Sequence, residues 1–278
     1  MLVVIGDLVA DLIVLGGAAL ERGTDNPAEV RLTRGGSAAN VAAAAAPRHP
    51  SRFIGRVGDD TLGHALVGEL AAAAVDVKVQ RGGRTGSIVV LVDAVGERTM
   101  ITDRGAAAEL GPIDPEWLAA ADWVHLPLYG FASTGSRRAV TDATARAAAD
   151  GARVSIDLSS VATLRELGGA ELRRILAEVR PDVVFANEEE ARAASELHVA
   201  PEGVSVIKRG PEPVLVGVQG RTAAVPVDRV DDVLDSTGAG DAFAAGYIVA
   251  ALCGADPYES ARAGSVLAMS ALRRPGAL

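Results

Sequence analysis

A glycine-rich heptapeptide near the end of the chain carries the strongest chemical signal in the sequence. It reads Asp235-Ser-Thr-Gly-Ala-Gly-Asp241 and leads directly into the apolar stretch Ala242–Gly246. Unpaired N–H groups and the positive dipole end make such a helix start an anion site, and Gly238 and Gly240 let the backbone approach the anion without a Cβ. Asp241 lies in the first turn, where the dipole keeps it ionised, so it can accept a proton from a hydroxyl. The segment therefore indicates phosphorylation of an alcohol; for an isolated Gly-Asp pair, a simple helix cap is the alternative interpretation.

Two further segments combine glycines with polar side chains where a ligand is expected. Gly35-Gly36-Ser37-Ala38-Ala39-Asn40 opens a predicted helix, and Gly6-Asp7-Leu8-Val9-Ala10-Asp11 follows the first predicted strand. Asn40 lies one turn into its helix, where an amide is a poor helix former, so we expect it to contact a ligand over the loop; a turn with a helix cap is the alternative. Asp7 and Asp11 follow the carboxyl end of a strand, which faces the usual ligand crevice of an open α/β sheet.

Short β-branched runs alternate along the chain with Ala- and Leu-rich stretches of helical length. This alternation, with continuously apolar strands, is typical of an α/β fold in which helices cover both faces of a parallel sheet. The final segment, Ala239–Leu272, is predicted to form two helices separated near Gly254–Pro257. The predicted strands are Leu2–Ile5, Arg52–Ile54, Val124–Leu126, Arg153–Ile156, Asp182–Phe185 and Val204–Lys208, and the earlier predicted helices are Asn40–Ala46, Thr61–Ala74, Ser136–Ala149, Ala170–Val179 and Glu188–Glu196.

Two regions interrupt the alternation. Thr85–Arg104 has a strand–turn–strand pattern, and Asp11–Leu15 and Glu29–Thr33 are short strand-like runs. We expect these strands, inserted at about residues 11–34 and 85–104, to form a small separate sheet that closes over a substrate as a lid. One thin sheet cannot bury its own apolar faces, so the lid is also expected to pair two chains into a homodimer. No linker or repeat marks a second unit, and residues 1–278 are interpreted as one domain.

Composition excludes several classes of protein. Twenty-seven Lys and Arg stand against 36 Asp and Glu, a net charge of −9, which speaks against a nucleic-acid partner. The single cysteine, Cys253, excludes an intrachain disulfide and fits a reducing compartment; its apolar helix predicts a core position. Met1–Leu20 is apolar but lacks a basic start and contains Asp7 and Asp11, so we expect neither a signal peptide nor a membrane span, and a cytoplasmic protein. The frequent alanine and arginine are attributed to genome composition.

Together these segments resemble the ribokinase-like (PfkB-type) carbohydrate and nucleoside kinase family. Gly35, Gly36 and Asn40 match its Gly-Gly-x-x-x-Asn helix start, and Asp235–Asp241 matches its Asp-Thr-x-Gly-Ala-Gly-Asp signature, with Ser236-Thr237 replacing Thr and the variable residue. The resemblance implies a three-layer sandwich with a mostly parallel central sheet and a small β-sheet lid. Weaker matches lie in order along the whole chain, at Phe53–Gly63, Asn187–Glu190 and Arg274–Ala277.

The resemblance also implies a role for each matching residue, with ATP and Mg²⁺ as cofactors. Asp241 falls at the family's catalytic base, and the backbone amides of Gly238, Ala239, Gly240 and Asp241 fall at its anion hole. The implied substrate-binding residues are Asp7, Asp11, Gly35, Gly36, Asn40, Arg104 and Tyr129. The implied nucleotide-binding residues are Asn187, Lys208, Gly210, Thr237, Gly238, Gly240 and Ser265, with Glu190 acting on magnesium indirectly and Asp235 a candidate for a monovalent cation such as K⁺.

The sequence departs from the family at three points. The segment Lys208–Pro213 lacks the usual second glycine, Ser265 replaces an adenine-contacting Asn of some members, and Pro127 stands where ribose-specific members place a sugar-binding Glu. Ribose, a fructose-type sugar and a nucleoside such as pseudouridine therefore all remain open as substrates. A catalytically silent sugar- or nucleotide-sensing protein on the same fold is the non-enzymatic alternative. A dinucleotide-dependent oxidoreductase is disfavoured because no Gly-x-Gly-x-x-Gly follows the first strand.

Overall fold

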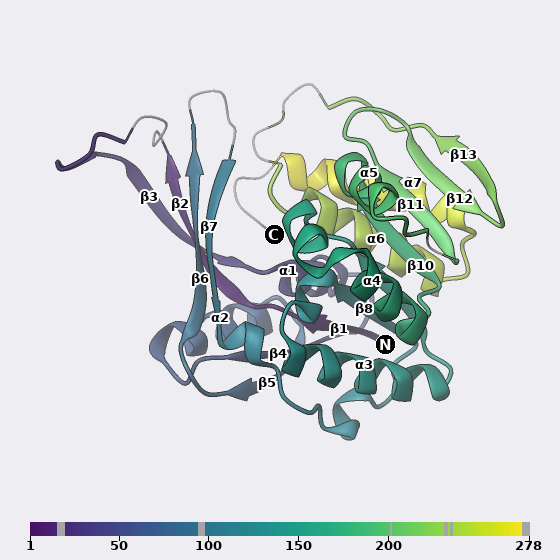
Figure 1. The fold of residues 1–278 in the computed structure, drawn as a ribbon, viewed down its shortest axis with the longest axis horizontal. Coiled ribbons are helices and arrows are strands. Elements are labelled where there is room, and N and C mark those ends of the chain that lie inside the picture. The colour runs from purple at the N-terminus through teal and green to yellow at the C-terminus, as the bar shows by residue number, and fades with distance from the viewer. Residues whose placement is uncertain (16–19, 94–97, 201, 231–232, 234–235, 274–278) are drawn as a thin grey trace.

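The computed structural model describes residues 1–15, 20–93, 98–200, 202–230, 233 and 236–273, and within them the strands form two sheets (Figure 1). The larger sheet is parallel from β11 to β5 and ends in two antiparallel strands, β12 and β13. Parallel neighbours bring their carboxyl ends to one edge, and that edge is where the site lies. In spatial order the strands are β13 (Arg221–Val225), β12 (Val214–Val218), β11 (Val204–Lys208), β10 (Val183–Asn187), β9 (Arg153–Asp157), β8 (Trp123–Pro127), β1 (Leu2–Gly6), β4 (Ser51–Val57) and β5 (Asp76–Arg81).

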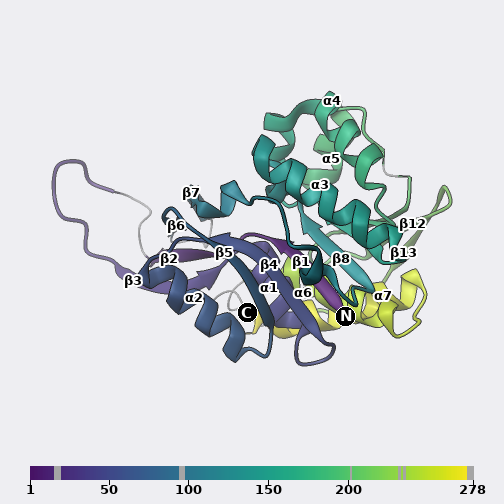
Figure 2. The ribbon, with the colours of Figure 1, turned by 90° about the horizontal axis from the view of Figure 1, so that it is seen from below.

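Helices cover both faces of the large sheet, as Figures 1 and 2 show. On β1, Leu2 and Val4 contribute to one apolar cluster and Val3 and Ile5 to the other, because successive side chains of a strand point to opposite faces. The first cluster includes side chains of α1 (Ser37–Ala45), α2 (Thr61–Ala72), α6 (Ala239–Leu252) and α7 (Pro257–Leu272), and the second those of α3 (Thr134–Ala149), α4 (Val161–Val179) and α5 (Glu188–Glu196). The three-layer α/β sandwich expected from the sequence is confirmed.

The smaller sheet contains the inserted strands, in the order β3 (Glu29–Gly35), β2 (Val9–Leu15), β6 (Thr85–Val92) and β7 (Arg98–Gly105). Only the β2–β6 pair is parallel. Alternate side chains of β6 and β7, among them Val90 and Thr102, line a cavity next to the large sheet. On the opposite face, Leu32 and Ile101 are about three-fifths exposed. The small lid sheet predicted from the two insertions is therefore present.

The structure adds elements that the sequence patterns did not indicate and corrects one placement. The six expected strands of the large sheet are confirmed, but β5, β12 and β13 were not predicted. Cys253, expected in the core, is the exposed residue that ends α6, so it lies outside the apolar face of that helix. In the part of the chain that the structure describes, no helix combines the length and apolar character needed to cross a membrane. Three short 3₁₀ helices complete the fold: η1 (Ala106–Glu109), η2 (Pro115–Leu118) and η3 (Leu128–Phe131).

Candidate active site

The carboxyl ends of the central strands, the first turns of α1 and α6, and the inner face of the lid enclose a cavity of about 890 Å³. Most residues singled out from the sequence line it, although they come from both ends of the chain. Gly35 does not line the cavity, and Asp235 lies outside the described residues. The predicted residues on its wall are Asp7, Asp11, Gly36, Asn40, Arg104, Tyr129, Asn187, Glu190, Lys208, Gly210, Thr237, Gly238, Ala239, Gly240, Asp241 and Ser265.

Asp241 lies in the first turn of α6 and is held by α1. Its Oδ1 accepts a hydrogen bond from the Ser37 hydroxyl at 2.7 Å, and its Oδ2 accepts one from Asn40 Nδ2 at 2.9 Å. The residue that caps α6 is Gly238, in the left-handed region with φ of 73°, and no side chain of the described residues caps this helix start. The carboxylate of Asp241 is thus engaged across the site rather than in capping its own helix. Burial raises the pKa of Asp241 to about 6, while the hydrogen bonds from Ser37 and Asn40 oppose that rise.

The lid side of the cavity contains two carboxylates, and Asp11 is the less satisfied of them. Its Oδ1 is buried and has no hydrogen-bond partner among the described residues. Burial, with the nearby charges of Asp7 and Asp241, raises the pKa of Asp11 to about 6. A buried carboxylate oxygen without a donor is costly, so the hydroxyl of a bound molecule would satisfy it. This feature fits a sugar-binding role for Asp11.

Asp7 is the better satisfied carboxylate. Its Oδ1 accepts from the backbone N–H of Ala38 at 3.3 Å, and its Oδ2 lies 3.4 Å from Arg104 Nη1. The Arg104 guanidinium also stacks over the Tyr129 ring, 3.9 Å from its centroid, and the Tyr129 hydroxyl donates to the carbonyl of Ser159. Arg104, for which a solvated strand face was the alternative, is therefore fixed against the cavity wall.

Two glycines at the junction of β3 and α1, Gly35 and Gly36, allow this wall to form. A Cβ on Gly35 would lie 2.2 Å from Asp11 Oδ1, and one on Gly36 would lie 2.4 Å from the carbonyl oxygen of Asp7. Gly36 also has a φ of +102°, which L side chains rarely adopt. Gly35 thus acts on the site by leaving room for Asp11 rather than by lining the cavity.

Charged side chains gather at the opposite end of the cavity, where strands β9, β10 and β11 end. Lys208 Nζ donates to Asp157 Oδ2 at 2.6 Å, and a Cβ on Gly240 would lie 3.3 Å from the same nitrogen. Burial lowers the pKa of Lys208, but the charges of Asp157 and Glu190 outweigh it and the pKa lies above its usual value. Lys208 is therefore a fixed positive charge beside the glycine-rich loop.

Glu190 and Asn187 form a capping box at the start of α5. Glu190 accepts from the backbone N–H and from Nδ2 of Asn187, while Asn187 Oδ1 accepts from the backbone N–H of Glu190, each at 2.8 Å. Burial, then the charge of Asp157, raises the pKa of Glu190 to about 7. Ser265 lines the far end of the cavity, where its hydroxyl donates to the carbonyl of Ala261 at 3.0 Å.

Sequence reasoning missed several polar residues that the fold brings into the site. Asp157 directly follows the predicted strand Arg153–Ile156, so the reasoning applied to Asp7 would have found it. Ser37 lies within the Gly-Gly-Ser segment, but its contact with Asp241 joins residues 204 positions apart. Arg34, which donates to Asn40 Oδ1 at 3.0 Å, had no signal beyond its position before the glycines.

An α/β sandwich with a carboxylate beside a glycine-rich helix start, facing a lidded cavity, defines a phosphotransferase of the ribokinase type. The family model described as "pfkB family carbohydrate kinase" matches residues 1–278, and the chain belongs to this family. It is a sugar or nucleoside kinase that phosphorylates an alcohol group.

Individual relatives agree with this assignment. A protein of Halopiger xanaduensis named as an ATP-dependent ribose-1-phosphate kinase is 36% identical over 248 residues, covering 84% of this chain and 79% of the relative. A fructokinase of Klebsiella pneumoniae is 32% identical over 254 residues, which cover 84% of this chain and 82% of the fructokinase. Among solved structures, adenosine kinase from Sinorhizobium meliloti superimposes with a TM-score of 0.87 at 25% identity, covering 99% of this chain and 94% of that one.

Proposed function

We propose that this kinase transfers the terminal phosphoryl group of ATP to a primary hydroxyl of a sugar or nucleoside, with Asp241 as general base. The observation that carries the proposal is the position of the Asp241 carboxylate. It lies on the cavity wall at the glycine-rich start of α6 and is oriented by Ser37 and Asn40. A base next to an anion-binding helix start is what transfer to a hydroxyl requires.

In the proposed reaction the acceptor hydroxyl approaches Asp241 Oδ1 or Oδ2 and gives up its proton as the oxygen attacks the terminal phosphorus of ATP. The bond from that phosphorus to the bridging oxygen breaks, and ADP leaves. With a pKa of about 6, Asp241 is ionised at neutral pH and is still basic enough to take the proton. The backbone amides of residues 238–241 stabilise the charge on the transferring group. Lys208 adds a fixed positive charge beside Gly240.

The residues around Asn187 fit a magnesium–nucleotide complex. The buried carboxylates of Glu190 and Asp157 face the same end of the cavity, and their mutual repulsion favours a bound cation. Both oxygens of Glu190 already accept from Asn187, so Glu190 would hold a metal through bound water rather than directly. When bound, Mg²⁺ would neutralise negative charge on the phosphate oxygens of the nucleotide. The monovalent-cation role of Asp235 stays a prediction from the sequence.

The acceptor end suits a polyhydroxylated ring. Asp11 offers an unpartnered oxygen, and Asp7 with Arg104 and Tyr129 forms a wall that combines a carboxylate, a cation and an aromatic edge. Asn40 retains one N–H that Asp241 does not use, so it contacts the substrate as a donor. Fructose-type sugars, ribose and nucleosides such as pseudouridine stay candidate acceptors. The names of the relatives add ribose 1-phosphate and adenosine.

The lid is proposed to join two chains. Its outer face exposes Val30, Leu32 and Ile101 to about three-fifths each. Apolar side chains gathered on one face of a thin sheet favour a partner surface. A second copy of the chain, presenting the same face, would bury them.

ATP consumption measured across a panel of these sugars, sugar phosphates and nucleosides tests the function. Turnover with at least one acceptor, abolished in an Asp241→Asn variant, supports the proposal. The alternative, a sensor on the same fold, predicts binding of ATP and of a sugar without turnover of any panel member.

A further inference from the structure

The buried guanidinium of Arg34 is a charge for which the proposed reaction has no direct use. Arg34 lies near the end of β3, and its side chain is 3% exposed. Its Nε is 3.8 Å from Glu69 Oε1, beyond hydrogen-bond distance, and the Glu69 side chain is 60% exposed. Removing a cation from water is costly unless other groups compensate. Part of the compensation comes from the exposed Glu69, and the rest from groups at the catalytic end of the cavity, namely Asn40, Asp241 and Asp11.

Arg34 determines which way the Asn40 amide points. Its Nη1 donates to Asn40 Oδ1 at 3.0 Å. A guanidinium has donors only, so the amide oxygen of Asn40 must face Arg34 and the NH₂ group must face the other side. On that side Asn40 Nδ2 donates to Asp241 Oδ2 at 2.9 Å. Asn40 is 4% exposed, so solvent does not offer a competing partner.

The Arg34 charge also acts on the carboxylates themselves. Burial lowers the pKa of Arg34, while the charges of Glu69, Asp241 and Asp11 favour its protonated form. In return, Arg34 opposes the rise in the pKa of Asp11. The other ionisable groups that act on Asp241 or Asp11 are Asp7, Asp157 and Lys208.

We propose that Arg34 is a positioning residue: by fixing the Asn40 amide, it orients the Asp241 carboxylate for proton transfer. The inference rests on the proposed role of Asp241 as base. Without Arg34, the Asn40 amide loses the donor that holds its oxygen and keeps only its bond to Asp241. The amide is then less firmly held, and so is the carboxylate that it orients toward the substrate proton.

The experiment compares Arg34→Met, Arg34→Lys and the control Arg31→Gln by the pH profile of kcat, the KM for ATP and the Tm. Arg31 is on the same strand and half exposed, and its ion-pair partner among the described residues is the neighbouring Glu29. We expect Arg34→Met to lower kcat about 10- to 100-fold and to move the acidic limb about one pH unit upward, because the donor to the carboxylate is less firmly held and a nearby cation is lost. The KM for ATP stays unchanged. Arg34→Lys keeps the charge and recovers part of both effects, and Arg31→Gln behaves as wild type.

A double-variant cycle tests whether Arg34 acts through Asn40. In an Asn40→Ala background, Arg34→Met should lower kcat little further, because the amide that it orients is gone. The inference is overturned if the double variant loses kcat by the product of the two single-variant factors, because the two residues then act independently. It is also overturned if folded Arg34→Met keeps the acidic limb of the wild-type pH profile. If Arg34→Met does not fold, Arg34→Lys decides: a reduced Tm with wild-type kcat and pH profile means a structural role only.

The same measurements separate this inference from the proposed function. Near-normal turnover of Asp241→Asn refutes the base itself, whatever Arg34 does. If Asp241→Asn loses most of its turnover while the Arg34 variants keep the wild-type kcat and pH profile, only the positioning role is refuted.

Discussion

Replacing Asp241 with asparagine tests the catalytic proposal most directly, because the site accommodates the amide. Asn Oδ1 can accept from Asn40 Nδ2 at the position of Asp241 Oδ2, and the new NH₂ can donate to the Ser37 hydroxyl, which rotates to accept. The variant therefore keeps both contacts and the shape of the site but loses the base. We expect Asp241→Asn to lower kcat by roughly 10²- to 10⁴-fold, the range for losing a general base.

The stability of this variant should move in the opposite direction to its activity. The carboxyl pKa of Asp241 rises from 3.8 to about 6 on folding. The folded state therefore binds this proton more tightly than the unfolded state. Its contribution to wild-type stability is fully present below about pH 4, decreases as the pH rises from 4 to 6, and is absent above 6. A shift of this size corresponds to at most about 3 kcal/mol opposing folding at neutral pH. An uncharged amide avoids that cost, so we expect the Tm at pH 7 to 8 to equal or exceed that of wild type.

Three measurements on one variant separate the interpretations: kcat with the identified acceptor, Tm between pH 5 and 8, and ATP affinity. ATP binding should survive because the anion site is made of backbone amides. A catalytic role is refuted by near-normal kcat. A loss of kcat accompanied by a large fall in Tm would mean that the carboxylate is needed for folding instead.

Four further predictions have equally definite outcomes. Asp11→Ala should raise the acceptor KM by one to two orders of magnitude, as expected for losing hydrogen bonds to a charged group, and leave the KM for ATP unchanged; equal losses toward both ligands would mark Asp11 as structural. In wild type the acceptor KM should also rise below about pH 6, where Asp11 becomes protonated; a KM that is flat from pH 5 to 8 contradicts this. Lys208→Met should lower kcat roughly 10²-fold and lower the Tm by leaving buried Asp157 unpaired; adding Asp157→Asn should restore the Tm but not kcat. Ile101→Glu on the outer face of the lid should convert a dimer to monomers in light scattering, and a wild-type monomer at micromolar concentration refutes the pairing.

The alternation of strands and helices was predictable because both faces of the parallel strands are buried and therefore continuously apolar. The missed strands lie toward the sheet edges, where this signal fades. In β5, Val77 and Val79 alternate with polar residues, a half-buried pattern that is easily assigned to a loop. The β12–β13 hairpin did carry a sequence signal, Gly220 between two short apolar runs. In the structure Gln219 and Gly220 both have positive φ, as a two-residue hairpin turn requires.

In the site, the residues marked by a local sequence motif could be predicted, and the contacts between distant segments could not. The Asp241 loop and the Gly35-Gly36 turn were recognisable because backbone geometry restricts the residues allowed there. The partners of Asp241 were not, because Ser37 and Asn40 meet it only after α1 and α6 pack together. Asn40 was expected to contact a ligand, but it also donates one N–H to Asp241, a role that no local pattern indicates.

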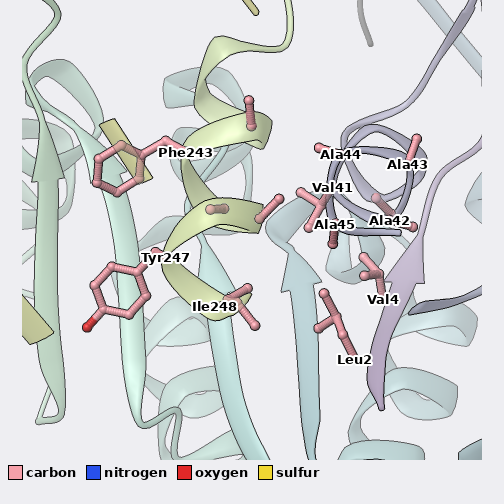
Figure 3. Packing of buried hydrophobic residues seen from close by; sticks show 14 of the residues in the cluster. Leu2, Val4, Val41, Ala42, Ala43, Ala44, Ala45, Phe243, Tyr247 and Ile248 are labelled. Atoms are coloured by element: carbon pink, nitrogen blue, oxygen red, sulfur yellow. The ribbon is translucent and has the colours of Figure 1, made fainter. Parts of the chain in front are cut away.

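The packing of α1 against α6 gives a structural reason for alanines that composition alone attributed to the genome. Eight of the nine residues of α1 are buried, and five of them, Val41 and Ala42–Ala45, form the apolar run that lies beside α6 in Figure 3. Small side chains let two helices approach closely, and here the close approach occurs at the ends where both helices begin. Ser37 and Asn40 are three residues apart and so share one face of α1. That face reaches the first turn of α6 only if the helices are close, because a serine hydroxyl extends a single atom beyond its Cβ. The alanine-rich sequence of α1 thus sets the distance at which Ser37 can hold Asp241, and larger side chains there would separate the base from the groups that orient it.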